Sequence, residues 1–262
     1  MKMVLFRHEL KMNFKNFLIW TLCVGLGCLG CILLYGSLEE QIQGIADSFS
    51  DMGSMSAALG MDKMNLATMR GYFATEVAMM HGLGGAMYAA ILGIGLVSKE
   101  QSAHTVDFLN VLPVKREKLL FSKYITLVTN ILLFQMICAA LYLLGFGLMG
   151  ENADGREFFL YFLAAALMQV EIGTVCFGIS AMSGKNRTGA GLGIAVLAFA
   201  MDMMCRIVPA IENLKYITPF YYANAADIYT NGEISVTMAA TAGGVIFFSL
   251  AAAWTIYCRK DL

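Results

Sequence analysis

The chain has 262 residues, of which 58% are hydrophobic and only 14% are charged, and its formal net charge is −1. A soluble domain of this size needs more charged residues to cover its surface. Binding to nucleic acid needs lysines and arginines clustered over a whole face, and the near-zero net charge argues against such a face. The composition therefore indicates a membrane protein and excludes nucleic acid as its partner.

An amphipathic pattern opens the sequence at residues 1–16. Apolar side chains recur there at steps of three and four residues, beside a row of basic ones. The apolar residues are Met3, Phe6, Leu10, Phe14 and Phe17, and the basic ones are Arg7, Lys11 and Lys15. The pattern predicts a helix that lies in the inner membrane interface with its lysines toward anionic headgroups. The alternative is a charged cytoplasmic start to the first span.

Six segments are long and apolar enough to span a hydrocarbon core of ~30 Å, which takes about 20 helical residues. They lie at residues 17–36, 73–97, 125–150, 158–182, 190–208 and 236–258. In lipid each backbone N–H and C=O must be satisfied within its own segment, and these runs are too long and too little alternating for barrel strands. The predicted fold is an all-α polytopic membrane protein with six transmembrane helices in one domain, residues 1–262.

Basic residues mark one side of the membrane. The N-terminal segment, the second and fourth connections and the C-terminus together hold thirteen of the lysines and arginines. The opposite side holds four basic residues mixed with acidic ones: Lys63, Arg70, Arg156 and Lys215. Because basic loops stay in the cytoplasm, both termini are predicted to be cytoplasmic.

Two connections are therefore expected outside. Residues 37–72 are acidic and rich in Met and Gly, with turn signals that predict one or two short helices over the outer mouth, or else a disordered tether. Residues 209–235 precede the last span.

Small residues repeat every four positions in the first two spans. Cys23, Gly27 and Cys31 form one stripe, and Gly85, Ala89 and Gly93 form the other. Such stripes let helices approach closely in lipid. We expect packing within the chain, with a dimer seam as the alternative.

The inner connection, residues 98–124, contains apolar residues at helical spacing, which a simple loop does not require. Val106, Leu109 and Leu112 follow helical spacing with Phe108 beside them, and Pro113 ends the run. A short helix with an apolar ridge along the inner membrane surface is predicted, in a place where lipid does not require it. We interpret this segment as a docking element for a cytoplasmic partner.

Four charged residues fall within the predicted spans: Glu76, Glu171, Asp202 and Arg206. Charge in hydrocarbon is costly, so such residues face a partner or a water-filled cavity. Asp202 and Arg206 are four apart on one helix face and are expected to pair, as a structural feature or as part of a translocation route. Glu76 lies near the outer end of its span, where it can reach water. Glu171 lies mid-span, and the alternatives for it are a protonated side chain, a hydrogen bond to another helix or a place in the pathway lining.

Catalytic patterns are absent from the sequence. There is no HExxH or GxSxG, and the three histidines are far apart. The stretch GISAMSGKN, residues 178–186, departs from a phosphate-binding loop in spacing, in its last residue and in lacking a preceding strand. The chain is predicted not to be an enzyme and to hold no cofactor, metal or ATP of its own.

Two stretches resemble a known family. Glu100 followed by TVDFLNVLPVKREKLLFSK, residues 105–123, resembles the inner loop of type 2 ABC-exporter permeases, and LKYITPFYYANAADIYTNGEI, residues 214–234, resembles their Ser/Thr-Pro-Phe-x-Tyr segment. The number of spans, the amphipathic start and the length also agree. The resemblance implies a permease that pairs with a second copy or a paralogue and docks separate ABC ATP-binding subunits, which hold ATP and Mg²⁺.

The resemblance also implies roles for individual residues. The coupling helix would use Glu100, Asp107, Phe108, Leu109, Leu112, Pro113 and Arg116. Spans two and five would line the route, with Glu76, Met80, Met87, Glu171, Asp202, Met203 and Arg206 as candidates. Pro219 and Phe220 would form the outer gate.

Small permeases of this kind, including those for phenol-soluble modulins and antimicrobial peptides, imply an amphipathic or hydrophobic substrate, with a peptide favoured, and a bacterial plasma membrane. One rival from another class is an ion-coupled secondary transporter or channel that uses Glu171 and His81. A membrane enzyme and a scaffold or sensor subunit are further alternatives.

Overall fold

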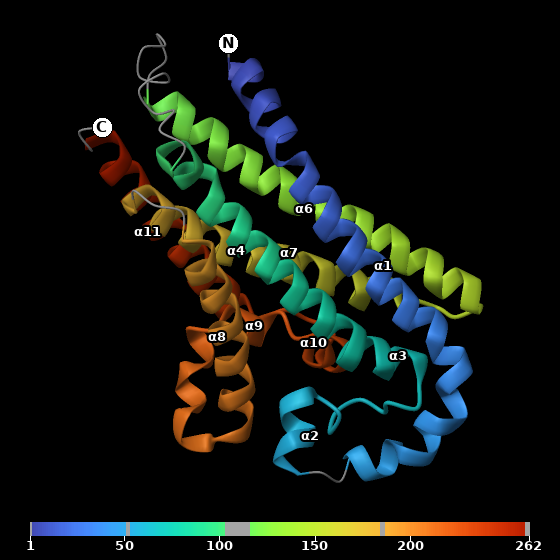
Figure 1. Cartoon of the computed structure of the whole chain (residues 1–262). Helices are drawn as coiled ribbons and strands as arrows, with labels where there is room; N and C mark the ends of the chain where they lie inside the picture. Colours follow the sequence, from blue (N-terminus) through green and yellow to red (C-terminus); the bar gives the residue numbers. More distant parts are fainter. Residues whose placement is uncertain (1, 51–52, 103–115, 184–186, 260–262) are drawn as a thin grey trace.

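The computed structural model describes residues 2–50, 53–102, 116–183 and 187–259, and within these ranges the chain forms helices and connections without strands (Figure 1). The long helices are α1 (Lys2–Ser50), α4 (Ala78–Ser102), α6 (Arg116–Met149), α7 (Gly155–Met182), α8 (Thr188–Ile207) and α11 (Val236–Arg259). The short elements are α2 (Ser54–Leu59), α3 (Met69–Tyr72), η1 (Phe73–Val77), η2 (Pro209–Tyr216), α9 (Pro219–Tyr222) and α10 (Ala225–Asn231).

Six helical segments in the described ranges are long and apolar enough to cross a membrane, which confirms the predicted fold class. The first begins earlier than predicted, because α1 runs without a break from Lys2 to Ser50. Residues 2–16 therefore continue directly into the apolar stretch, and their place in the membrane interface stays a prediction. A straight helix of this length measures about 74 Å, so α1 extends well beyond a hydrocarbon core of ~30 Å.

The connection after α1 holds the two short helices that its turn signals predict. Gly60, at φ 75°, ends α2 in the left-handed region that favours glycine. The Thr68 hydroxyl caps α3 by accepting a hydrogen bond from the Gly71 N–H, at 3.1 Å. Tyr35 of α1 donates to the Ala67 carbonyl at 2.7 Å, so this connection is fastened to the helix that precedes it.

The second span contains a π-helical turn, η1, between α3 and α4. Phe73 at its start is fully buried, and its ring centroid lies 5.2–6.2 Å from those of five other aromatic residues. These are Tyr142, Phe146, Phe158, Tyr161 and Tyr229. Aromatic pairs at this spacing are favourable beyond simple burial, so the turn is held firmly in the core.

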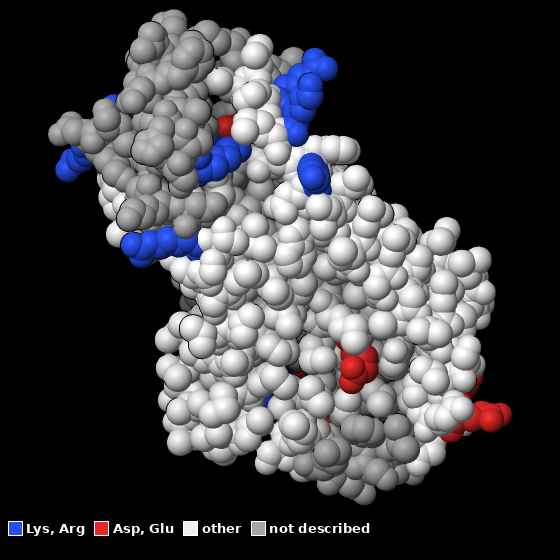
Figure 2. Space-filling model, viewed as in Figure 1, with Lys and Arg blue, Asp and Glu red and all other residues white. Residues whose placement is uncertain are grey.

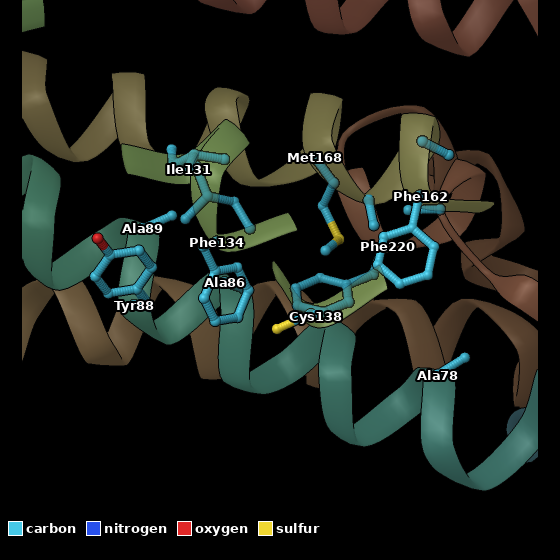
Figure 3. Close-up of a cluster of buried hydrophobic side chains, with 14 of the residues drawn as sticks. Ala78, Ala86, Tyr88, Ala89, Ile131, Phe134, Cys138, Phe162, Met168 and Phe220 are labelled. Atoms are coloured by element: carbon cyan, nitrogen blue, oxygen red, sulfur yellow. The ribbon is translucent and has the colours of Figure 1, made fainter. Parts of the chain in front are cut away.

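The second span and α7 form the centre of the bundle. In each of them 67% of the most apolar window is buried, compared with 17% in α11 and 22% in α8. Figure 3 shows Ala86 and Ala89 of α4 beside Ile131 and Phe134 of α6. The peripheral helices consequently leave most of their apolar surface outside the core of the chain.

Close packing of α4 on α7 explains the second small-residue stripe. A Cβ added at Gly93 would collide with the Gly173 carbonyl oxygen, and one added at Gly85 would collide with the side-chain amide of Gln169. This stripe therefore packs within the chain, as expected. In the first stripe only Cys31 packs within the chain, against Met80, whereas Cys23 is exposed and Gly27 has open space beside it.

Both ends of the chain lie at the same end of the bundle, together with the end of α4 and the start of α6 (Figure 1). Figure 2 shows lysines and arginines gathered at that end and acidic residues toward the opposite one. The distribution agrees with the charge asymmetry of the sequence, and the cytoplasmic side stays a prediction.

Gly93→Ala is expected to destabilise the bundle by about 1–3 kcal/mol, the usual cost of overpacking, because the added methyl group forces α4 away from α7. Unfolding of the purified protein in mixed micelles measures the change. Gly95→Ala is the matched control, since a Cβ there meets nothing within 4 Å. Equal stability of the two variants would contradict the close approach of the helices.

Candidate functional site

The chain re-enters the bundle after α8. Residues 209–216 form the 3₁₀ helix η2, and Thr218 then donates a hydrogen bond of 2.8 Å to the Ala198 carbonyl of α8. Ala198 lies nine residues before the end of α8, or about 14 Å along its axis. Pro219 begins α9 there, and Pro219, Phe220 and Tyr222 are all buried. The Thr-Pro-Phe segment, expected outside the membrane, thus returns to lie alongside the body of α8.

A small cavity of about 40 Å³ lies where this segment meets α2, η1, α4, α7 and α8. Its lining is mainly apolar, with thioether and aromatic side chains and a few polar groups. The main lining residues are Thr75, Met79, Gly82, Met168, Phe199, Asp202, Met203, Phe220 and Asn224. This volume admits a few water molecules and no larger solute. The cavity is therefore too small to serve as an open binding pocket.

Phe220 closes the cavity from the side of α9. Its ring packs edge-on against Phe199 of α8, with centroids 5.4 Å apart, and it approaches Gly82 of α4. In Figure 3 the Phe220 ring lies beside Met168 of α7. Phe220 therefore contacts three helices of the bundle, which suits the gate position predicted for it.

A network of ion pairs beside the cavity joins parts of the chain that are far apart in the sequence. Arg206 Nε donates to both carboxylate oxygens of Asp202, at 3.2 Å each, which confirms the expected pair. Arg206 Nη1 also donates to Asp227 of α10 at 2.8 Å, and Asp227 accepts from Lys63 Nζ at 2.6 Å. The Arg206 guanidinium lies over the Tyr221 ring, 4.4 Å from its centroid. This network joins α8 to two other segments, and we call those segments, residues 54–68 and 218–231, the cap.

Asp227 is ionised in the network. Burial raises the pKa of its carboxyl, but the positive charges of Arg206 and Lys63 outweigh burial and hold the pKa below its ordinary value. Two carboxylates then face two cations, so the cluster is neutral as a whole. Neutral pairing is what allows the nearly buried Arg206 side chain to remain charged in the last turn of α8.

A second polar contact joins α7 to the re-entrant segment. Glu171 is 5% exposed and accepts a hydrogen bond of 2.8 Å from the Tyr222 hydroxyl. Burial and the neighbouring Glu171 raise the pKa of Tyr222 well above its ordinary value, so its hydroxyl keeps the proton that it donates. Glu171 does not line the cavity, and its contact is with the segment that carries Phe220.

The other route candidates are spread over different surfaces. Met80 is 47% exposed, and its sulfur lies 3.9 Å from that of Cys31 on α1. Neither Met80 nor the partly buried Met87 is among the residues that line the cavity. Met79, one position away and about 100° around the helix, takes that place. Glu76 lies in the π-helical turn, partly buried.

The predicted coupling residues are only partly described. Asp107, Phe108, Leu109, Leu112 and Pro113 lie outside the described residues. Glu100 belongs to the last turn of α4, and Arg116 is the first residue of α6. The two flanking residues thus lie at the end of the bundle that holds both chain termini.

Sequence reasoning missed several residues of the site, namely Lys63, Met168, Tyr222 and Asp227. The local sequence does signal the start of α10, because Asn224 accepts from the Asp227 N–H at 3.1 Å as an N-cap. It gives no sign that the Asp227 carboxylate meets Arg206, 21 residues earlier, and Lys63, 164 residues earlier. No group of three metal-ligating side chains occurs among the described residues.

Arg206→Gln is expected to destabilise the protein by about 3 kcal/mol, because it leaves Asp202 and Asp227 without their shared cation. Thermal unfolding in detergent, followed by tryptophan fluorescence, measures the loss. Lys215→Gln is the control, since the Lys215–Glu212 pair lies at the surface, where such pairs contribute little, and its removal should change the melting temperature only slightly. Equal melting of both variants would show that the network does not hold the cap.

Comparison with known proteins agrees with this architecture. No curated protein matches the chain. A family model described as ABC-2 family transporter protein matches residues 3–262, which is almost the whole sequence. The match confirms the resemblance to type 2 ABC permeases at the level of the family, whose members are membrane components that work with ABC ATP-binding partners. The chain therefore belongs to the ABC-2 family of transporter proteins and is a multi-pass membrane protein.

Proposed function

We propose that this chain is the permease subunit of an ATP-driven exporter, which moves an amphipathic or hydrophobic substrate, with a peptide as the favoured class, out of the cytoplasm or the membrane. The family match over residues 3–262 carries this proposal. The charge distribution supports an orientation with both termini in the cytoplasm. The bacterial plasma membrane follows from the resemblance to small exporter permeases.

The lining of the cavity supports the substrate class. Met79, Met168 and Met203 offer flexible thioethers, and Phe199 and Phe220 offer aromatic faces, next to the carboxylate of Asp202. Methionine-rich surfaces adapt to apolar ligands of varied shape. The cavity is far too small for a peptide, so transport requires the cap to move away from α8.

Separate subunits supply the energy in this proposal. ATP and Mg²⁺ are bound by an ABC ATP-binding partner, which grips the coupling helix around Asp107, Phe108, Leu109, Leu112 and Pro113. Two permease chains, identical or paralogous, share two such partners. ATP-driven closure of the partners shifts both coupling helices, and rigid helices carry the shift to the cap.

Docking through the coupling helix predicts that Phe108→Ala with Leu109→Ala releases the ATP-binding subunit during purification while the permease stays folded. Co-purification followed by unfolding measurements tests both parts. Phe247→Ala with Phe248→Ala is the matched control, because these two residues are exposed in the middle of α11. Retained binding by the Phe108/Leu109 variant would count against the docking site.

The ion-coupled alternative is not favoured by the family match. His81 is fully buried, and its two ring nitrogens each have a partner at 3.0 Å, the Tyr142 hydroxyl and the Gln135 amide oxygen. His81 and Glu171 also belong to separate polar contacts, one with α6 and one with α9. This separation supports a structural role for both side chains.

Glu171→Gln is accordingly expected to retain ATP-driven transport, because the glutamine oxygen can still accept from Tyr222. Uptake of a dye-labelled amphipathic peptide into inverted vesicles, with and without ATP and with a protonophore, measures the effect. Loss of uptake in a folded variant, together with protonophore sensitivity of the parent protein, would favour ion coupling instead.

A further inference from the structure

A buried cluster of charges lies at the end of the bundle opposite the cap. The Glu9 carboxylate of α1 accepts a hydrogen bond from a lysine on each oxygen. Lys123 of α6 donates to Oε1 and Lys99 of α4 donates to Oε2, both at 2.8 Å. Lys123 Nζ also donates to the Leu96 carbonyl of α4 at 2.7 Å. One carboxylate therefore joins three helices, and we call Glu9, Lys99 and Lys123 the triad.

Two residues of the triad are almost completely removed from solvent, and the third, Lys99, is partly exposed. Glu9 is 3% exposed and Lys123 is 0% exposed. Buried ion pairs contribute little to stability compared with apolar residues of similar volume, but they bind only in one geometry. A triad at this place thus fixes the relative positions of α1, α4 and α6 more than it stabilises them.

The triad flanks the connection that carries the predicted coupling helix. Lys99 lies three residues before the end of α4, and Lys123 lies seven residues after the start of α6. These separations amount to about 5 Å and about 10 Å along the two helices. Glu9 thus forms ion pairs with residues close to each end of the 103–115 connection.

A hydroxyl group ties the same end of α4 to α7. Ser180 Oγ accepts from the Ser98 N–H at 2.9 Å and donates to the Ile94 carbonyl at 2.5 Å. An α-helix normally pairs these two groups of α4 with each other. Displacement of the end of α4 is therefore felt by α1 and α6 through the triad and by α7 through Ser180.

We propose that Glu9 is a positioning residue that couples movement of the 103–115 connection to the helix bundle by holding Lys99 and Lys123 at once. This inference rests on the proposed ATP-driven function and adds the contact through which the force passes. In the absence of the triad, the ATP-binding subunit still docks and hydrolyses ATP, but its movement no longer reaches the cap.

The test uses the permease co-purified with its ATP-binding subunit in lipid nanodiscs. Ser56→Cys, at a buried position of the cap, reports cap movement through its rate of maleimide labelling, after subtraction of the labelling of the native cysteines. Glu9→Gln combined with Lys123→Met removes opposite charges together, so neither is left buried alone, and Lys99 can reach solvent. Glu40→Gln with Lys11→Met makes the same chemical changes at exposed positions of α1.

We expect MgATP with vanadate to change the labelling rate of the thiol introduced by Ser56→Cys, both in the otherwise unchanged chain and in the exposed control. In the triad variant the ratio of rates with and without nucleotide should fall to about 1, the value for uncoupled sites, while the ATP-binding subunit stays bound and active. A nucleotide response retained by the triad variant overturns the proposal, as does loss of the bound subunit. A parent chain that binds no ATP-binding subunit overturns the proposed function itself.

Discussion

The close approach of α4 to its neighbours is the constraint on which the rest of the structure depends. Gly93 lies against the Gly173 backbone of α7, and a Cβ on Gly191 of α8 would meet the Ala90 carbonyl of α4 at 3.2 Å. In lipid there is no hydrophobic drive between helices, so such contacts provide the association energy. With α4 fixed between α7 and α8, the re-entrant segment has a defined wall on which to pack.

Two clusters of ion pairs lie at opposite ends of this central unit. At one end Glu9 binds two lysines, and at the other Arg206 binds two aspartates. Each cluster joins segments that are far apart in the sequence, while the core between them is mainly aromatic and small side chains, with a few buried polar groups such as His81 and Glu171. The bundle therefore resembles a rigid body with an ionic fastening at each end, which suits a protein that passes movement from one side of a membrane to the other.

The sequence predicted the parts of the fold that depend on local pattern. Six spans follow from hydropathy, the Asp202–Arg206 pair from spacing, and the packed stripe at Gly85 and Gly93 from periodicity. It could not predict contacts that depend on the rotation and depth of helices. Met79 lines the cavity in place of the predicted Met80, because periodicity alone does not set which face of the helix meets the cavity. The contacts of Tyr222 with Glu171 and of Asp227 with Arg206 depend on how deeply the re-entrant segment returns along α8, and no local sequence signal specifies that depth.

The π-helical turn at residues 73–77 has a consequence for how the second span can deform. A turn closed by i to i+5 hydrogen bonds holds more residues than an α-turn, so it stores surplus chain within a continuous helix. If that turn tightens, the part of the span on the termini side rotates and advances relative to the aromatic anchor at Phe73, without any backbone break. The second span thus contains extra backbone length, in the π-helical turn between the cap and the packed part of α4.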